Sequence, residues 1–220
     1  MNMTHIKYID IKTYISSMDI NYSYGQGTNK PPTKIKGDRI ILKGPVNENL
    51  EFEQFYKFHA GDGSVPMAEY NLFKSMQDRK YYRDNMWKYM IEGWEDDENA
   101  YWSIHNKEDE LIGFVDVEFE KETNRTEPGV WLHPDYWGKS YAREAFLIVI
   151  NYSFVEKDFD VVYYTVATEN ENSYNFCSKI TNEIGGEYVG VIKNAYHIPE
   201  KGALDFHHFQ ITKQQYQDYI

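Results

Sequence analysis

The sequence predicts a mixed α/β fold, and three segments near its centre carry this prediction. Val130 to Leu132 is a short apolar run of strand type, and Pro134 should end its pairing because proline has no backbone N–H to donate. From Ala142 to Phe154, apolar residues recur at helical spacing and predict a core-facing helix. Val161 to Ala167 is nearly continuous in strand formers, as expected for an interior strand. Strand, helix and strand in this order indicate an α/β domain.

The segments upstream of this centre alternate in the same way. Apolar spacing of helical type and alternation of strand type are each bounded by glycine-rich or polar turns. Helices are expected at Asn49–His59 and Asp78–Glu92, and strands at Asp38–Lys43, Ala100–His105 and Leu111–Glu120. In the last strand, one face is expected to be buried and the other partly solvated, because side chains alternate along a strand.

Downstream, the pattern predicts one more helix and two more strands. The helix can begin at Asn172 or Ser173, both of which are good capping residues, and it places Phe176, Cys177 and Ile180 on its apolar face. Glu187–Ala195 and Asp205–Thr212 have strand character and should complete the sheet.

Composition narrows the class of protein. A chain of 220 residues with 41 % apolar content suits one well-packed domain with an extension. The net charge of -12 argues against nucleic acid as a general partner and leaves room for a cationic acceptor such as an amine, although a solvated acidic surface explains most of it equally well. Cys177 is the sole cysteine, so an internal disulfide is excluded. There is no basic-apolar leader and no run long enough to cross a bilayer, so the expectation is a cytoplasmic protein without a membrane partner.

The turn between the central strand and helix has the features of an anion site. Gly138 lets backbone approach a ligand, and the first helical residues after it present unpaired N–H groups at the positive end of the helix dipole. Lys139 and Arg143 add positive charge at the same place. A phosphate or pyrophosphate is the natural ligand for such a turn, although one glycine at a strand–helix connection can also be a plain turn.

The residues around this turn carry a family resemblance. PDYWGKSYAREA, residues 134–145, resembles the acyl-CoA pyrophosphate loop of the GNAT N-acetyltransferase superfamily, and WLHPDYWGKSYA is most similar to its ribosomal-protein N-terminal (Rim-type) branch. The family pattern Gln/Arg-x-x-Gly-x-Gly/Ala falls on Asp135, Gly138 and Ser140. Gly138 matches strictly, and Asp135 occurs in the Rim-type variant. Ser140 replaces the second glycine and adds a side chain that either donates a hydrogen bond to the phosphates or is merely tolerated.

A second block strengthens the resemblance. Asn170 and Ser173 match the Asn-x-x-Ser motif with which GNAT enzymes bind the pantetheine arm and begin the following helix. The resemblance covers residues 37–220 and implies a GNAT domain with a mostly antiparallel sheet of six to seven strands, about four helices and a V-shaped split between the fourth and fifth strands. Residues 1–36 lie outside it and are expected to be an extension that packs either on the domain or on a partner chain. In the second case it would support a homodimer.

The resemblance also implies a function. It implies transfer of an acetyl group from acetyl-CoA to a primary amine, either a protein N-terminus or a small molecule; the alternative is an acyl-CoA-binding or regulatory module without turnover. Residues expected to bind the co-substrate are Trp131, Leu132, His133, Gly138, Lys139, Ser140, Tyr141, Ala142, Arg143, Asn170 and Ser173.

Direct attack by an amine needs a base, oxyanion donors and a proton for the departing thiolate. The first candidate for the base is Glu127, at a position where Rim-type chains commonly carry glutamate, with Asp116 and His133 as the other candidates. A backbone N–H near Trp131 or Leu132 is expected to bind the oxyanion. Asp116 is otherwise expected to be a solvated or capped carboxylate.

The general acid is open between three groups. Cys177 occupies the position where many GNAT enzymes carry a tyrosine, and a thiol could protonate a thiolate; a core role, with water or Tyr174 as the acid, is the preferred interpretation. His207 and His208 do not predict a metal site, because adjacent strand residues point to opposite faces.

Overall fold

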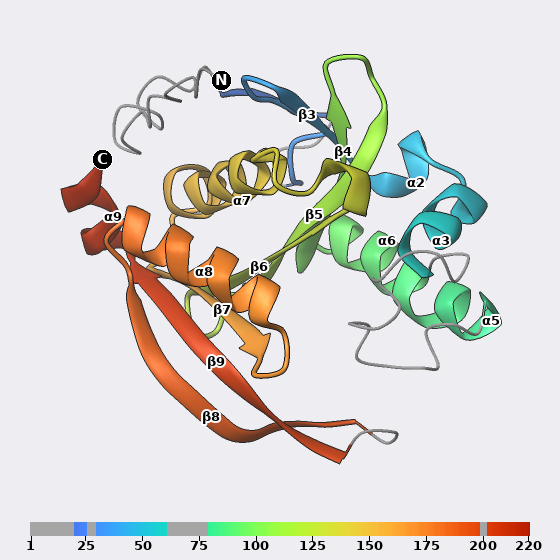
Figure 1. Cartoon of the computed structure of the whole chain (residues 1–220). Helices are drawn as coiled ribbons and strands as arrows, with labels where there is room; N and C mark the ends of the chain where they lie inside the picture. The colour runs from blue at the N-terminus through green and yellow to red at the C-terminus, as the bar shows by residue number, and fades with distance from the viewer. Residues whose placement is uncertain (1–19, 26–29, 61–78, 199–201) are drawn as a thin grey trace, which may run out of the picture.

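The structure is a computed structural model that describes residues 20–25, 30–60, 79–198 and 202–220. The described strands form one sheet in the order β1-β2-β3-β4-β5-β6-β7-β9-β8 (Figure 1). Every neighbouring pair is antiparallel except β6 and β7, which are parallel. The strands are β1 (Asn21–Ser23), β2 (Lys34–Lys36), β3 (Ile40–Lys43), β4 (Asn99–Asn106), β5 (Leu111–Glu120), β6 (Arg125–Leu132), β7 (Val161–Ala167), β8 (Glu187–Ile198) and β9 (Gly202–Thr212).

The sheet is wider than the expected six to seven strands. β1 and β2 come from the segment expected to be an extension, and they pair with each other and with β3. Ile35 in β2 is fully buried in the main core, and Tyr22 in β1 packs against that core. The described part of this segment therefore packs on the domain, which was one of the two expected alternatives, the other being a partner chain. Residues 1–19 lie outside the described residues.

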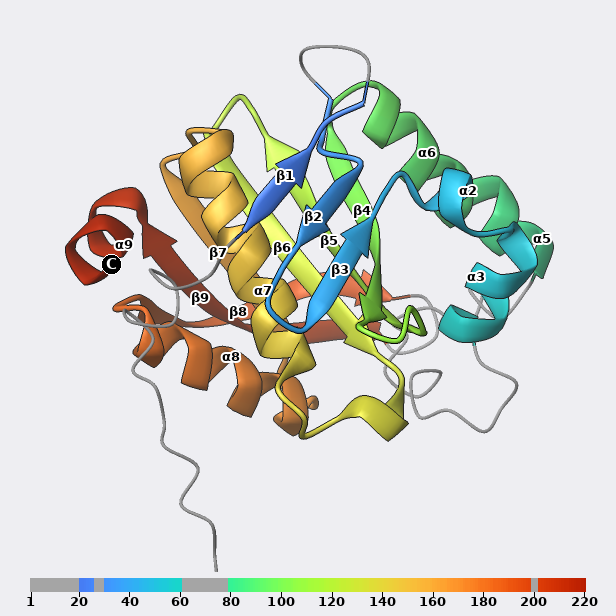
Figure 2. The same ribbon diagram turned by 90° about the horizontal axis from the view of Figure 1, so that it is seen from above.

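The helices cover the sheet in two groups (Figures 1 and 2). α7 and α8 lie side by side on one face, while α2, α3, α5 and α6 gather next to β4. The helices are α2 (Val46–Asn49), α3 (Phe52–Ala60), α5 (Arg79–Tyr82), η2 (Arg83–Trp87), α6 (Lys88–Glu95), η3 (Pro134–Tyr136), α7 (Tyr141–Asn151), η4 (Tyr152–Glu156), α8 (Glu171–Glu183) and α9 (Lys213–Tyr219). The expected helix at 78–92 is present as α5, a π-helical turn and α6 in succession. Residues 61–78, which follow α3, lie outside the described residues.

α7 joins the two largest cores of the molecule. Ala145, Ile148 and Val149 pack into the core beneath β3, β4 and β5. Phe146 and Ile150 pack instead into the core shared with β7, α8 and β9. The predicted apolar stripe is therefore broader than one helix face, and α7 fixes both halves of the sheet relative to the turn that precedes it.

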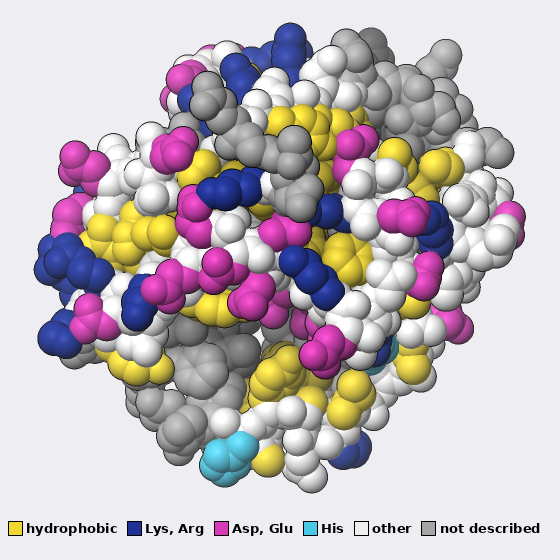
Figure 3. Space-filling model, turned by 180° about the vertical axis from the view of Figure 1, so that it is seen from behind, with side chains coloured by type: hydrophobic (Ala, Val, Ile, Leu, Met, Phe, Trp, Pro, Cys, Tyr) yellow, Lys and Arg dark blue, Asp and Glu magenta, His cyan; other side chains and the backbone are white. Residues whose placement is uncertain are grey.

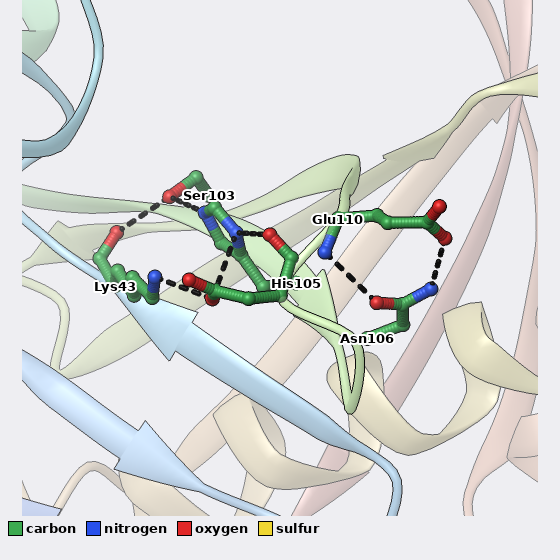
Figure 4. A network of polar contacts seen from close by, with 6 residues as sticks. Lys43, Ser103, His105, Asn106 and Glu110 are labelled. Atoms are coloured by element: carbon green, nitrogen blue, oxygen red, sulfur yellow. Dashed lines mark hydrogen bonds and ion pairs between the residues drawn. The ribbon is translucent and has the colours of Figure 1, made fainter.

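A buried polar network ties the hairpin between β4 and β5 to β3 (Figure 4). Nε2 of His105 lies 3.0 Å from Oγ of Ser103, and its Nδ1 lies 3.2 Å from the backbone oxygen of Asp109. Lys43 in β3 binds the Asp109 carboxylate at 2.6 Å. Burial lowers the pKa of His105 from its ordinary value of 6.5, so the ring is held neutral. The network thereby fixes the hairpin without a buried charge.

β8 and β9 form a long hairpin that ends the sheet (Figure 1). His207 and His208 lie on opposite faces of β9, as expected from strand alternation. His207 binds the hydroxyl of Tyr188 at 2.9 Å, and the His208 ring stacks on Tyr163 at 5.4 Å.

Candidate active site

The turn before α7 has the backbone of an anion-binding loop. Gly138 has a φ of +71°, in the left-handed region that favours glycine, and nothing lies within 4 Å of the Cβ position it leaves empty. Ser140 directly precedes α7 and also has a positive φ of 64°, while its side chain makes no capping hydrogen bond. The first N–H groups of the 11-residue helix are thus left for a ligand.

A cavity of about 550 Å³ opens in front of this turn. It lies between the end of β6, the start of α7 and the start of α8, and it is large enough for a substantial part of a nucleotide-like ligand. Its lining residues are Val130, Trp131, Leu132, Tyr136, Trp137, Gly138, Ser140, Tyr141, Ala142, Arg143, Asn170, Asn172, Ser173, Phe176, Lys179 and Ile180.

The structure brings nine of the eleven expected co-substrate residues to this cavity. The exceptions are His133, whose ring packs 5.8 Å from Phe58, and Lys139, whose Nζ lies 5.3 Å from the centre of the Tyr136 ring. Sequence reasoning did not predict the apolar residues that line this cavity, such as Phe176. An apolar residue on a helix face is assigned to the core when the cavity beside the helix is not known.

Positive charge in the cavity is partly compensated. Arg143 binds Glu183 at 2.9 Å, and Lys179 lies 3.9 Å from the same carboxylate. Both cations come from helices that flank the opening, so an anionic ligand would meet them together with the N-terminus of α7. Asn170 caps α8 by accepting a hydrogen bond of 3.0 Å from the Ser173 backbone N–H, which corrects the expected cap at Asn172 or Ser173.

The sheet splits between β6 and β7, the fourth and fifth strands counted from β3. These two strands pair only at Arg125 with Val161 and at Thr126 with Val162, and they diverge beyond that point. The backbone N–H of His133 donates to Ile112 in β5. Because N–H groups alternate in direction along a strand, those of Val130 and Leu132 point into the split. Leu132 was one of the two expected oxyanion donors; the N–H of Trp131 points toward β5.

Glu127 lies at the closed end of this split. Its Oε1 accepts a hydrogen bond of 2.8 Å from Oγ1 of Thr165, so the pair bridges β6 and β7 just beyond their last backbone pairing. Burial raises the pKa of the Glu127 carboxyl, and the nearby Glu118 adds to this effect, while the Thr165 hydrogen bond opposes it. A carboxylate with a raised pKa at the point where two strands diverge is well placed to accept a proton.

Asp116 is not the solvated or capped carboxylate that was expected. The residue is only 5 % exposed. At this point β5 is buried on both faces, because α3 and α6 cover the face that was expected to be solvated. Burial raises the pKa of this carboxyl well above its ordinary value, with further contributions from Glu118 and Glu127. The strand pattern could not show this, since it does not reveal which helices lie over a face.

The structure places Cys177 in the core and not in the cavity lining. The residue is 5 % exposed and packs with Phe146, Val166 and Ile180, and burial raises the pKa of its thiol to about 12. This position agrees with the preferred core interpretation. Tyr174, the other side chain considered as an acid, packs against the His207 ring at 4.4 Å.

A family model described as Acetyltransferase (GNAT) domain matches residues 39–181. The chain belongs to the GNAT acetyltransferase family. The matched segment runs from β3 to α8 and so contains the phosphate loop, the split and the cap at Asn170. Members of this family use acetyl-CoA, and the cavity of about 550 Å³ lies at the N-terminus of α7.

Relatives of this GNAT protein agree on the fold. An uncharacterized N-acetyltransferase p20 of Bacillus licheniformis is 27 % identical over 119 residues, which are 54 % of this chain and 64 % of the relative. A spermidine N-acetyltransferase SpeG chimera from Vibrio cholerae and hSSAT superposes with a TM-score of 0.63 at 15 % identity, covering 82 % of this chain and 99 % of that one. A GNAT-family acetyltransferase from Bacillus anthracis gives 0.61 at 21 % identity, with the same coverage.

Two further properties concern the described residues of this GNAT domain. They contain no group of three or more side chains arranged to hold a metal ion. None of their helices combines the length and the apolar character needed to span a bilayer.

Proposed function

We propose that this protein transfers an acetyl group from acetyl-CoA to a primary amine by direct attack in a ternary complex. The observation that carries the proposal is the alignment of three features along one path. The phosphate loop of α7 opens on the cavity, the cavity reaches Val130 on β6, and Glu127 precedes Val130 on the same strand at the split. We infer that a pantetheine arm entering at the loop would lead toward this carboxylate.

The step has a simple balance. Glu127 accepts a proton from the acceptor ammonium, and the neutral nitrogen then attacks the thioester carbon. The C–N bond forms and the C–S bond breaks. The second proton that the nitrogen must lose passes through water to the departing thiolate, so the products are the acetylated amine, the CoA thiol and protonated Glu127. The N–H groups of Val130 and Leu132, which face the split, would stabilise the negative charge on the carbonyl oxygen.

The Glu127→Gln variant tests this role. The amide keeps the shape and the Thr165 contact but cannot take the proton, so kcat should fall by roughly 10²- to 10⁴-fold while the affinity for acetyl-CoA is retained. The measurement is thiol release against a panel of amines and short peptides, with acetyl-CoA binding followed by titration calorimetry.

Glu108→Gln is a charge-matched control, because Glu108 is exposed in the hairpin between β4 and β5. Unaltered turnover in Glu127→Gln would remove Glu127 as the base and leave Asp116 as the next candidate. Binding of acetyl-CoA by the wild type without thiol release on any acceptor would favour the acyl-CoA-binding module instead.

Several finer assignments remain part of this proposal. They are the Rim-type branch, the cytoplasmic location, the boundary between an extension at 1–36 and a domain at 37–220, and a homodimer. Because β1 and β2 belong to the sheet, the dimer is best tested by deleting only residues 1–19 and measuring the mass in solution. An unchanged mass would remove any role of that segment in dimerisation.

A further inference from the structure

Three carboxylates form a row on one face of the sheet, next to the split. Asp116 and Glu118 follow each other on β5 at the strand repeat of about 6.8 Å, so both side chains point the same way. Glu127 on β6 lies directly opposite Glu118 in the register. Acidic side chains gather on the molecular face opposite α7 and α8 (Figure 3).

One oxygen of the Asp116 carboxylate lacks a partner. Its Oδ1 is buried and has no hydrogen-bond partner among the described residues. It lies over Gly129, where an added Cβ would come within 2.6 Å of it, so the absence of a side chain at Gly129 makes room for the carboxylate. A buried carboxylate oxygen without a donor is costly, and a ligand that brings an N–H group would satisfy it.

The groups around the row are hydroxyls and aromatic rings. Tyr101 interacts with Asp116, Tyr89 with Glu118 and Thr165 with Glu127. None of the ion pairs formed among the described residues involves any of the three carboxylates.

Arg125 is the cationic residue nearest to the three carboxylates in the register of β5 and β6, and it lies at the closed end of the split. It pairs across the strands with Glu120, and its guanidinium stacks on the Tyr163 ring at 4.2 Å. Burial raises the pKa of Asp116, Glu118 and Glu127 alike. Without a counter-charge the ionised form of each carboxyl is therefore disfavoured, and a bound cation would stabilise the ionised row.

One positive charge on the acceptor does not suffice for this. The reacting nitrogen must lose its proton before it attacks, so at that moment it is neutral, and Glu127 becomes neutral by taking the proton. Asp116 and Glu118 are still uncompensated. A second ammonium, separated from the first by a short carbon chain, would reach them, because facing side chains on paired strands are about 5 Å apart.

We propose that the acceptor is a linear diamine or polyamine: one amine reacts beside Glu127, and a second, still charged, binds Asp116 and Glu118. The hydroxyls of Tyr101 and Tyr89, which interact with these two carboxylates, lie beside this second position. The inference rests on the proposed acetyl transfer and specifies its substrate class.

The test compares 1,4-diaminobutane with butylamine, which has the same reactive end and lacks the second charge. In the wild type, kcat/KM for the diamine should exceed that for butylamine by about tenfold or more, as one buried charge contact of ~1.4 kcal/mol would give. In Glu118→Gln the ratio of kcat/KM for the diamine to that for butylamine should fall to about one, even where the lost effect of Glu118 on the pKa of Glu127 changes the rates with both amines. The acetyl-CoA affinity should be unchanged. Glu108→Gln should retain the full preference.

Equal kcat/KM for the two amines in the wild type, or a preference for a peptide N-terminus over both, would overturn the inference and leave acetyl transfer intact. A Glu118→Gln variant that lowers both amines equally would also overturn it. Calorimetric titration of each amine into the wild-type complex with CoA provides a readout independent of turnover: tighter binding of the diamine supports the second site, and equal binding contradicts it. Failure of acetyl transfer itself would appear separately, as no thiol release with any acceptor.

Discussion

Ser140 combines a left-handed backbone with a place in the wall of the cavity. Left-handed backbone is unfavourable for a residue with a Cβ by roughly 1–2 kcal/mol, and the Ser140 hydroxyl makes no capping hydrogen bond that would offset this. The residue lines the cavity at the start of α7, where the family pattern has glycine or alanine. Its hydroxyl therefore either contacts the phosphates or contributes nothing.

Ser140→Gly and Ser140→Ala separate these roles. Glycine relieves the backbone strain, and this gain is larger than the cost of the greater conformational entropy that glycine gives the unfolded chain. We therefore expect the free energy of unfolding of Ser140→Gly, measured by urea denaturation, to exceed that of the wild type by about 0.5–1 kcal/mol. Ser140→Ala keeps the strain and should not gain. If the hydroxyl is merely tolerated, both variants bind acetyl-CoA within threefold of wild type; a tenfold loss in both would show that it donates to a phosphate.

At the scale of one element, the hairpin between β4 and β5 depends on a neutral histidine. His105 is enclosed by Ser103, Asp109 and Lys43, and Lys43 opposes a charge on the ring while the Asp109 backbone oxygen and carboxylate favour it. Burial dominates and lowers the pKa of His105, so protonation occurs more readily in the unfolded chain than in the folded one.

The free energy of unfolding should therefore depend on pH through this residue. Above the unfolded pKa of about 6.5 its contribution is complete, and it is lost as pH falls, because the unfolded state then binds the extra proton. Other groups titrate in the same range, so the measured quantity is the difference between wild type and His105→Gln in urea denaturation from pH 8 to pH 5. The wild type should lose stability relative to the variant toward pH 5, and a constant difference would contradict this.

Elements were predictable where local pattern decides them. β5 and β7 begin and end where the alternation of strand formers predicts, and Gly138 marks the turn before α7. Predictions failed where distant segments decide the outcome. Asp116 is buried because helices from earlier in the chain cover β5. The extension packs on the domain, as one of the expected alternatives, but its strands at 21–23 and 34–36 form because β3 offers them an edge, which their own pattern does not reveal. The carboxylate row likewise depends on the register between β5 and β6, which a single strand does not reveal.

At the scale of the whole molecule, the net charge of -12 should guide a cationic acceptor toward the site. Salt screens such attraction over about 30 Å at 0.01 M and about 10 Å at 0.1 M. We expect the KM for 1,4-diaminobutane to rise several-fold between these sodium chloride concentrations, with a smaller rise for butylamine. Acetyl-CoA, which is anionic, should show no such rise, and an equal effect on all three substrates would contradict steering by charge.

The position of α7 in both major cores affects how the molecule unfolds. The split between β6 and β7 interrupts the sheet, but the packing of Phe146 and Ile150 on one side and of Ile148 and Val149 on the other continues across it. The two halves of the chain therefore share a single cooperative unit, in which neither half keeps a complete interior once α7 is removed. An opening wide enough for a substrate can thus exist in the sheet without creating a boundary between two independently folding parts.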